Sequence, residues 1–132
     1  LLMASGVLSI FDDFREPLLK WLDWMKQDGL LYVYGRFNSM NIDTKISFRN
    51  NKVGNPNWEN GLTSYSVETV RNFLTDKGYT ATFKRFYLKI SISEHEDPIR
   101  TYTKITQDGE RIVMNGANMI AEHYFFKIER ST

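Results

Sequence analysis

The sequence predicts a single α/β domain, and three features of its 132 residues favour this fold class. Residues 11–37 contain a complete helix, its glycine stop and an apolar run, which together make half of a βαβ unit. A second apolar run, residues 1–4, precedes this stretch, so strand, helix and strand follow one another. The C-terminal half changes to a period of two with β-branched and aromatic residues, which predicts further strands.

The first helix is predicted to begin after Asp13 and to end at Gly29. Asp12 and Asp13 can cap its N-terminus, and Pro17 fits only the first turn because proline has no N–H to donate. Gly29 can adopt the left-handed conformation that ends a helix. Apolar side chains recur at i, i+3, i+4 and i+7 and predict one buried face: Leu18, Trp21, Leu22 and Met25.

Residues 30–34 follow as an apolar run without polar alternation, which is typical of a parallel strand covered on both faces. A right-handed crossover through the helix would place residues 1–4 beside this strand and parallel to it. In open α/β sheets, ligands bind at the carboxyl ends of the strands. We therefore expect the functional site within residues 4–11 and 34–38.

A long segment over residues 38–65, rich in Asn, Gly and Pro, separates this unit from the second half of the chain. Loops of this length in compact domains are usually functional or mobile. Residues 42–49 show some alternation, which is typical of a short strand or helix inside the loop, and we expect Trp58 to anchor its far end.

A second helix and four strands complete the predicted order. Ser66 is expected to cap a helix over residues 67–77, and Gly78 to end it. The dipeptide Asp108-Gly109 predicts a β-hairpin turn. The strands are predicted over residues 79–92, 99–105, 111–114 and 119–128. The last of these most simply pairs antiparallel with the first.

Composition excludes several classes of protein. A net charge of +1 gives no indication of nucleic-acid binding, and the absence of cysteine excludes disulfides and thiolate metal sites. The two histidines, His95 and His123, show no ligand spacing, so no metal site is expected. No apolar run approaches the roughly 20 residues of a membrane span, and no signal peptide is visible. We expect a cytoplasmic protein without membrane or nucleic-acid partners.

Four stretches, taken in order, carry a resemblance to a known family. ASGVLSIFDD (residues 4–13) and KQDGLLYVYGRFN (residues 26–38) are similar to the fourth strand with its loop and to the turn that leads into the fifth strand. The helix before the sixth strand is similar to SYSVETVRNFLTDKGYT (residues 64–80). The antiparallel seventh strand is similar to HYFFKIER (residues 123–130). The family is the class I S-adenosylmethionine-dependent methyltransferases, and the chain resembles the C-terminal half of their Rossmann-like domain.

This resemblance implies a single domain over residues 1–132 that lacks the N-terminal cofactor-binding motifs of the family. The Gly-rich loop and the acidic ribose-binding residue would precede Leu1. Because the chain opens inside an apolar run, we expect Leu1 to be either a processed end or, as the favoured alternative, a cut within a longer protein. The isolated chain is therefore expected to be inactive, and the enzyme in its full length to use S-adenosylmethionine.

The resemblance also points to residues near the cofactor and the methyl acceptor. Ser9 stands where many members of the family carry a histidine, which places Ser9 beside the substrate and leaves the catalytic residue open. Asp43 in the long loop could act as a base or accept a substrate hydrogen bond, or could serve a turn. The residues expected at the cofactor are Ser5, Gly6, Val7 and Phe11, and those expected at the substrate are Ser9, Tyr34, Arg36, Phe37, Asn38 and Asp43.

Two functions stay open at this point. The first is the C-terminal portion of a methyltransferase that acts on a small molecule. Methyl transfer from a sulfonium needs mainly positioning of the acceptor, so a catalytic motif is not required. The second is a non-catalytic α/β module that binds a protein partner through an open sheet edge at residues 1–4. If the strand at residues 1–4 has an unpaired edge, we expect the chain to self-associate through it, or else this strand to be frayed and disordered.

Overall fold

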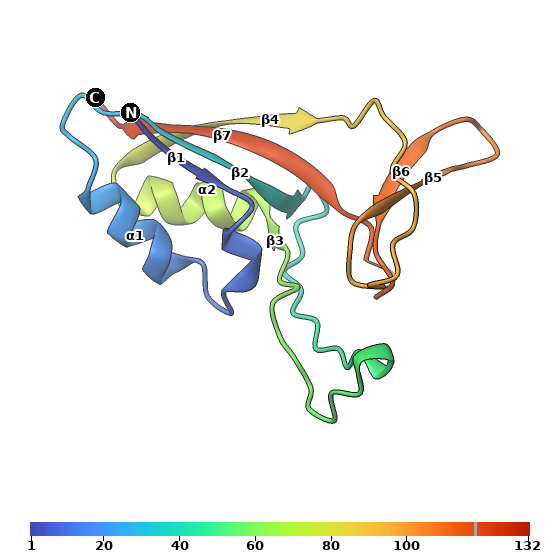
Figure 1. Cartoon of the computed structure of the whole chain (residues 1–132). Coiled ribbons are helices and arrows are strands. Elements are labelled where there is room, and N and C mark those ends of the chain that lie inside the picture. Colours follow the sequence, from blue (N-terminus) through green and yellow to red (C-terminus); the bar gives the residue numbers. More distant parts are fainter. Residues whose placement is uncertain (118) are drawn as a thin grey trace.

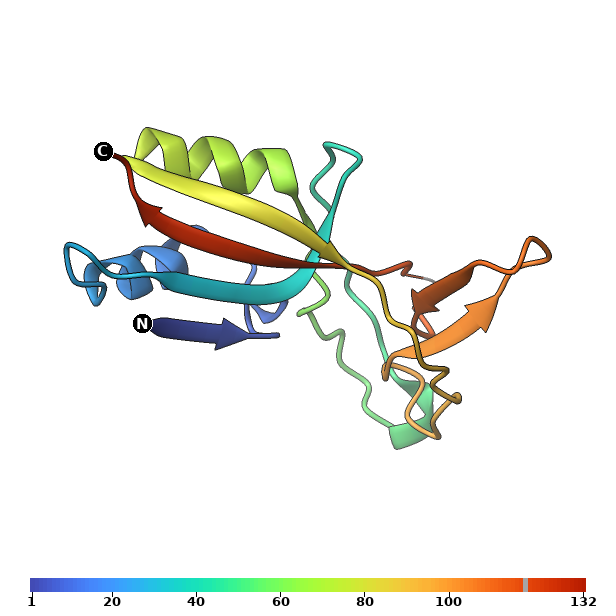
Figure 2. The same cartoon turned by 90° about the horizontal axis from the view of Figure 1, so that it is seen from above.

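The chain folds around one mixed β-sheet in a computed structural model that describes residues 1–117 and 119–132. In spatial order its long strands are β1 (Leu2–Ser5), β2 (Leu31–Asn38), β7 (Glu122–Arg130) and β4 (Tyr79–Phe86), and the short β3 (Tyr65–Ser66) pairs with the end of β2. Strands β1 and β2 are parallel, and β7 runs antiparallel to both β2 and β4. Figure 2 shows the four long strands side by side.

Both helices lie on the same face of this sheet (Figure 1). Helix α1 (Arg15–Asp23) joins β1 to β2, and α2 (Val67–Asp76) joins β3 to β4. A hairpin of β5 and β6 and the long loop after β2 extend beyond the carboxyl ends of β1, β2 and β4 (Figure 1). The remaining elements are η1 (Leu8–Ile10), η2 (Asn51–Val53), β5 (Tyr102–Ile105) and β6 (Arg111–Met114).

The structure confirms the α/β class and the parallel pairing of the two strands around the first helix. It also confirms that the last strand pairs antiparallel with the strand after α2. Strand β4 is shorter than residues 79–92, because the chain after Phe86 turns toward the hairpin. There the Thr103 N–H donates to the Ile92 carbonyl at 3.0 Å.

The helix ends are only partly as expected. Ser66 accepts a hydrogen bond from the Thr69 N–H at 2.9 Å, and Gly78 has a φ of 79°, so both signals of α2 are confirmed. Asp13 accepts the Arg15 N–H at 2.9 Å at the start of α1. The expectation for Gly29 was wrong, because α1 already ends at Asp23 and the φ of Gly29 is not positive. A β-carbon at Gly29 would instead collide with the Met25 side chain.

The expectation that β2 is covered on both faces was also wrong for this chain. Its residues alternate between buried and half-buried, because α1 and α2 pack on one face only. The covered face carries Val33 and Phe37, whereas Tyr32 and Tyr34 point to the open face. An apolar run without polar alternation therefore does not reveal which face a helix covers.

The long loop after β2 runs out and back as two extended arms. Isolated bridges join Thr44 to Ser64 and Phe48 to Glu59, so no regular strand forms over residues 42–49. Trp58 does not anchor the loop, because 67% of it is exposed. The tip is held instead by Lys52, whose Nζ donates to the Glu96 carbonyl at 3.2 Å.

The core fills the space between the helices and the covered face of the sheet. Phe126 on β7 is fully buried, and its ring centroid lies 4.2 Å from the ring centroids of both Phe37 and Phe83. The helices contribute their fully buried leucine and valine side chains: Leu18, Leu22, Val70 and Leu74. One aromatic row thus joins β2, β7 and β4 and packs against both helices.

Replacing Phe126 by alanine should lower the free energy of unfolding by about 3–5 kcal/mol, since a buried ring is lost and a cavity is left. Urea denaturation of the chain measures this change. Phe125→Ala is the matched control, because Phe125 is 42% exposed on the open face of the same strand. Equal losses in the two variants would show that the helix-covered face is not the main core.

Candidate functional site

The carboxyl ends of β1 and β2 meet at one edge of the sheet, where the sequence predicted the site. The Gly6 N–H donates to the Tyr34 carbonyl at 2.7 Å, which ties the turn after β1 to β2. Gly6 has a φ of 70°, and no atom lies within 4 Å of the position that a β-carbon would take. Ser5 and Phe11 are exposed and Val7 is half-buried. The four residues expected at the cofactor therefore surround a turn that is open to solvent.

Ser9 lies in η1 and is buried, with 6% of it exposed. Its carbonyl accepts the Thr63 N–H at 3.0 Å, which ties η1 to the end of the long loop. This burial leaves little of Ser9 accessible to a ligand.

Strand alternation separates the residues expected at the substrate. Phe37 points to the covered face and lies in the core with 1% exposed, so a ligand has no access to its ring. Tyr34 and Arg36 point to the open face. Of the three residues Tyr34, Arg36 and Phe37, only Tyr34 and Arg36 can therefore contact a ligand on the open face of the sheet.

On the open face, Tyr34 belongs to an aromatic cluster with His123, Phe125 and Phe86. The Tyr34 ring stacks on His123 at 5.6 Å and lies 4.8 Å from Phe125 and 6.0 Å from Phe86. Burial lowers the pKa of Arg36. Burial and the positive charge of Arg36 lower the pKa of His123 below its ordinary value of 6.5, so His123 is neutral at pH 7.

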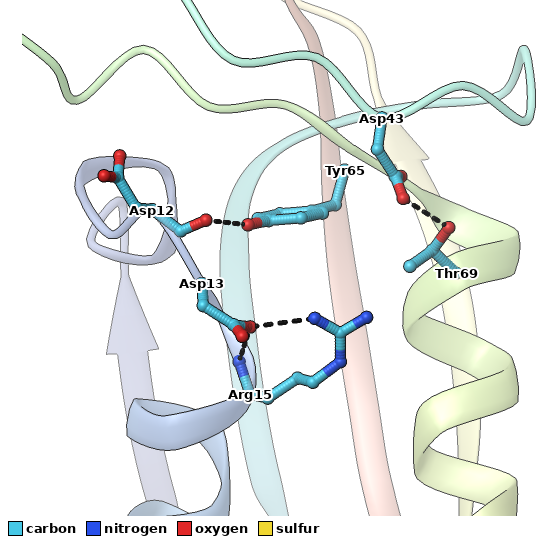
Figure 3. Close-up of polar contacts among 6 residues, drawn as sticks. All are labelled: Asp12, Asp13, Arg15, Asp43, Tyr65 and Thr69. Carbon is cyan, nitrogen blue, oxygen red and sulfur yellow. Dashed lines mark hydrogen bonds and ion pairs between the residues drawn. The ribbon is translucent and has the colours of Figure 1, made fainter.

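Asn38 and Asp43 hold the beginning of the long loop. The Asn38 Nδ2 donates to the Ile42 carbonyl at 2.7 Å. One Asp43 oxygen accepts the Ser66 N–H at 2.8 Å. The other accepts the Thr69 hydroxyl at 2.9 Å, as Figure 3 shows. The carboxylate thus lies at the N-terminus of α2, where the helix dipole favours an anion. The contacts of Asp43 favour the structural alternative over a role as base.

Tyr65 is a residue of this edge that the sequence did not single out. Its hydroxyl donates to the Asp12 carbonyl (Figure 3). The Tyr65 ring lies edge-on to Phe14, with 4.6 Å between the ring centroids. Burial and the nearby charge of Asp13 raise the pKa of Tyr65. The hydrogen bond from the Arg15 N–H lowers the pKa of Asp13. Tyr65 therefore links the turn before α1 to the strand before α2.

Glu122 is a second residue that the sequence analysis missed. Its carboxylate accepts the Ser39 N–H at 3.1 Å and the Tyr124 hydroxyl at 3.0 Å, and it lies 3.4 Å from the Arg85 guanidinium. Burial and the bond to Glu122 raise the pKa of Tyr124. Ser39 directly follows β2, and the other partners come from β4 and β7, so only the register of the sheet could have indicated their proximity.

Within residues 1–117 and 119–132, no group of three or more His, Asp and Glu side chains is placed to hold a metal ion. His95 Nδ1 accepts the Asp97 N–H at 3.0 Å in an exposed turn. None of the helices in the described part of the chain is long and apolar enough to cross a membrane.

Comparisons of this chain with protein-family models, with curated proteins and with solved structures found no match.

Replacing Asp43 by alanine should lower the free energy of unfolding by about 1–2 kcal/mol, because the start of α2 loses its capping carboxylate. Chemical denaturation followed by circular dichroism measures the loss. Asp108→Ala in the exposed hairpin turn is the matched control and should have a smaller effect. If the two variants were equally stable, the helix-capping role of Asp43 would be refuted.

Proposed function

We propose that this chain is the C-terminal portion of a S-adenosylmethionine-dependent methyltransferase that acts on a small molecule. The observation that carries the proposal is the order and direction of the sheet elements. A parallel β1–α1–β2 unit is followed by α2, by β4 and by the antiparallel β7. This is the order that the resemblance gives for the fourth to the seventh strand of a Rossmann-like methyltransferase domain.

The turn after β1 fits one side of the cofactor. It offers an exposed hydroxyl at Ser5, open space beside Gly6 and a partly exposed ring at Phe11. These residues and Val7 would hold the cofactor from the β1 side. When bound, S-adenosylmethionine supplies a methyl group on a positively charged sulfur, which is already a good electrophile.

The chain itself would contribute positioning of the acceptor. Tyr34 and Arg36 share the open face near the end of β2, and Arg36 can orient an anionic or polar group of a small molecule. We assign no catalytic base to the chain. We also propose a cytoplasmic location, with which the absence of cysteine is compatible.

The isolated chain should show no saturable binding of S-adenosylmethionine at low micromolar concentration in a calorimetric titration, whereas the longer protein encoded by the same gene should bind it. In that longer protein, Gly6→Ala should weaken binding by about tenfold, because a side chain strains the turn at a positive φ. Gly109→Ala is the control, since Gly109 has a φ of 82° and lies in the distant hairpin turn.

Saturable binding of S-adenosylmethionine to the isolated chain would contradict the expectation that the main cofactor-binding residues lie outside residues 1–132. If the Gly6→Ala and Gly109→Ala proteins bound S-adenosylmethionine with equal affinity, the proposal that the turn after β1 contacts the cofactor would be refuted.

The second candidate function is a non-catalytic module that binds an extended strand of a partner protein at β1. Within the described residues β1 pairs with β2 alone, and Met3 is 75% exposed on this edge strand. Unpaired backbone groups on an edge strand are a template for another strand. The same edge could pair with a second copy of the chain.

Sedimentation velocity of the chain tests this edge. Met3→Lys should shift a concentration-dependent dimer toward the monomer, because a charge opposes pairing at an edge. Met40→Lys is the matched control, since Met40 is 76% exposed in the long loop. A monomer at every concentration in the parent chain would refute self-association through β1.

A further inference from the structure

A pocket lies at the carboxyl edge of the sheet, where β4 and β7 stop pairing. Phe86 and His123 form their last pair. Beyond this pair, the Ala121 N–H donates to the Val113 carbonyl at 2.8 Å, so the chain before β7 follows β6 rather than β4. The chain that follows β4, beginning at Tyr87, no longer pairs with β7. The divergence leaves a hollow between the end of β4, strand β6 and the start of β7.

One part of the wall of this pocket is apolar and aromatic. Phe86 is 40% exposed, Tyr87 is 65% exposed and Ile120 is 64% exposed, and all three line the pocket together with Ile112. The Arg85 guanidinium lies 4.8 Å from the centre of the Tyr87 ring. A concave surface with exposed aromatic side chains and a few polar groups is typical of a small-molecule site.

Arg111 supplies a cation whose N–H donors form only long hydrogen bonds within the chain. Its Nη1 lies 3.5 Å from the Leu88 carbonyl and its Nη2 lies 3.4 Å from the Ser91 hydroxyl, both at the long limit of a hydrogen bond. Within the described part of the chain, no carboxylate lies within ion-pair distance of Arg111. A guanidinium has five N–H donors in a planar fork that matches a carboxylate.

The acidic residues of the pocket do not neutralise this cation. Glu122 already accepts hydrogen bonds from Ser39 and Tyr124 and lies beside Arg85. Glu110 is exposed in the hairpin and, in the described part of the chain, forms no ion pair with Arg111. Arg111 and Glu110 are thus the charged side chains of this pocket without an ion pair among the described residues, and Arg111 adjoins the aromatic wall.

We propose that this pocket binds a small planar molecule that carries a carboxylate. Its ring lies against Phe86 and Tyr87, and its carboxylate accepts hydrogen bonds from the Arg111 guanidinium. The proposal goes beyond the methyltransferase assignment and does not rest on it, because it uses neither the turn after β1 nor a cofactor.

Titration of the ¹⁵N-labelled chain with benzoate, followed by NMR, tests the proposal. The backbone amides of residues 86–88, 111–113 and 120–123 should shift saturably, with a Kd of about 1 mM as expected for a ligand of this size. Benzamide, which lacks the charge, and acetate, which lacks the ring, should each bind at least about tenfold more weakly. Equal affinities for benzoate and benzamide, or no saturable shift in these residues, would overturn the proposal.

Arg111→Gln should weaken benzoate binding about tenfold, because the charged fork is lost. Arg111→Lys keeps the charge without the fork, so an intermediate loss of about threefold is expected. Lys104→Gln is the matched control on β5, since Lys104 is an exposed cation of the same hairpin that lies 3.9 Å from Glu94. Unchanged affinity in both Arg111 variants, with the spectrum of the folded chain retained, would refute the role of Arg111.

Discussion

Strand β7 holds the molecule together, because it pairs with β2 along one edge and with β4 along the other. On its covered face, Phe126 lies between Phe37 of β2 and Phe83 of β4, with both ring centroids at 4.2 Å. Without β7, the β1–α1–β2 unit and the β3–α2–β4 unit would be joined in the sheet only by the short pairing of β2 with β3, and this aromatic row would be lost. The last strand of the sequence therefore completes a core that the first half of the chain begins.

The one-sided packing of α1 and α2 explains the chemistry of the opposite face. Because no helix of the described chain covers that face, the rings of Tyr34, Phe86 and Phe125 stay partly exposed and pack on one another and on His123. Half-buried Arg36 on β2 lies opposite His123 on β7, and its charge disfavours protonation of His123. A cation beside aromatic rings makes this surface suitable for contact with an anionic or aromatic partner.

Polar contacts at the carboxyl edge fix the loops around the candidate sites. Asp43 holds the start of α2, Tyr65 holds the turn before α1, and Glu122 holds the end of β2. These three residues satisfy backbone groups and shape the edge, whereas Arg36 and Arg111 keep donors for a ligand. The turn after β1 and the pocket around Arg111 lie at the same edge of the sheet but on different strands, so the two proposals can be tested separately.

The sequence by itself determined the elements that local interactions encode. Ser66 caps α2 and Gly78 ends it, and Gly109 takes the positive φ of the hairpin turn, because each of these signals acts within a few residues of the chain. The order of strand, helix and strand also predicted that the carboxyl ends of β1 and β2 meet at one edge of the sheet. The assignment of individual residues did not follow, since Phe37 entered the core and Asp43 became a cap.

Only the tertiary structure decided which face of the sheet is open, where β4 leaves β7 and which side chains meet at the carboxyl edge. Ser39 and Glu122 lie 83 residues apart in the chain, and their contact depends on the register between β2 and β7. A shift of that register by one residue would move every side chain of β7 to the opposite face. Composition and periodicity describe one helix or strand at a time. They therefore cannot predict the register between two strands that lie far apart in the sequence.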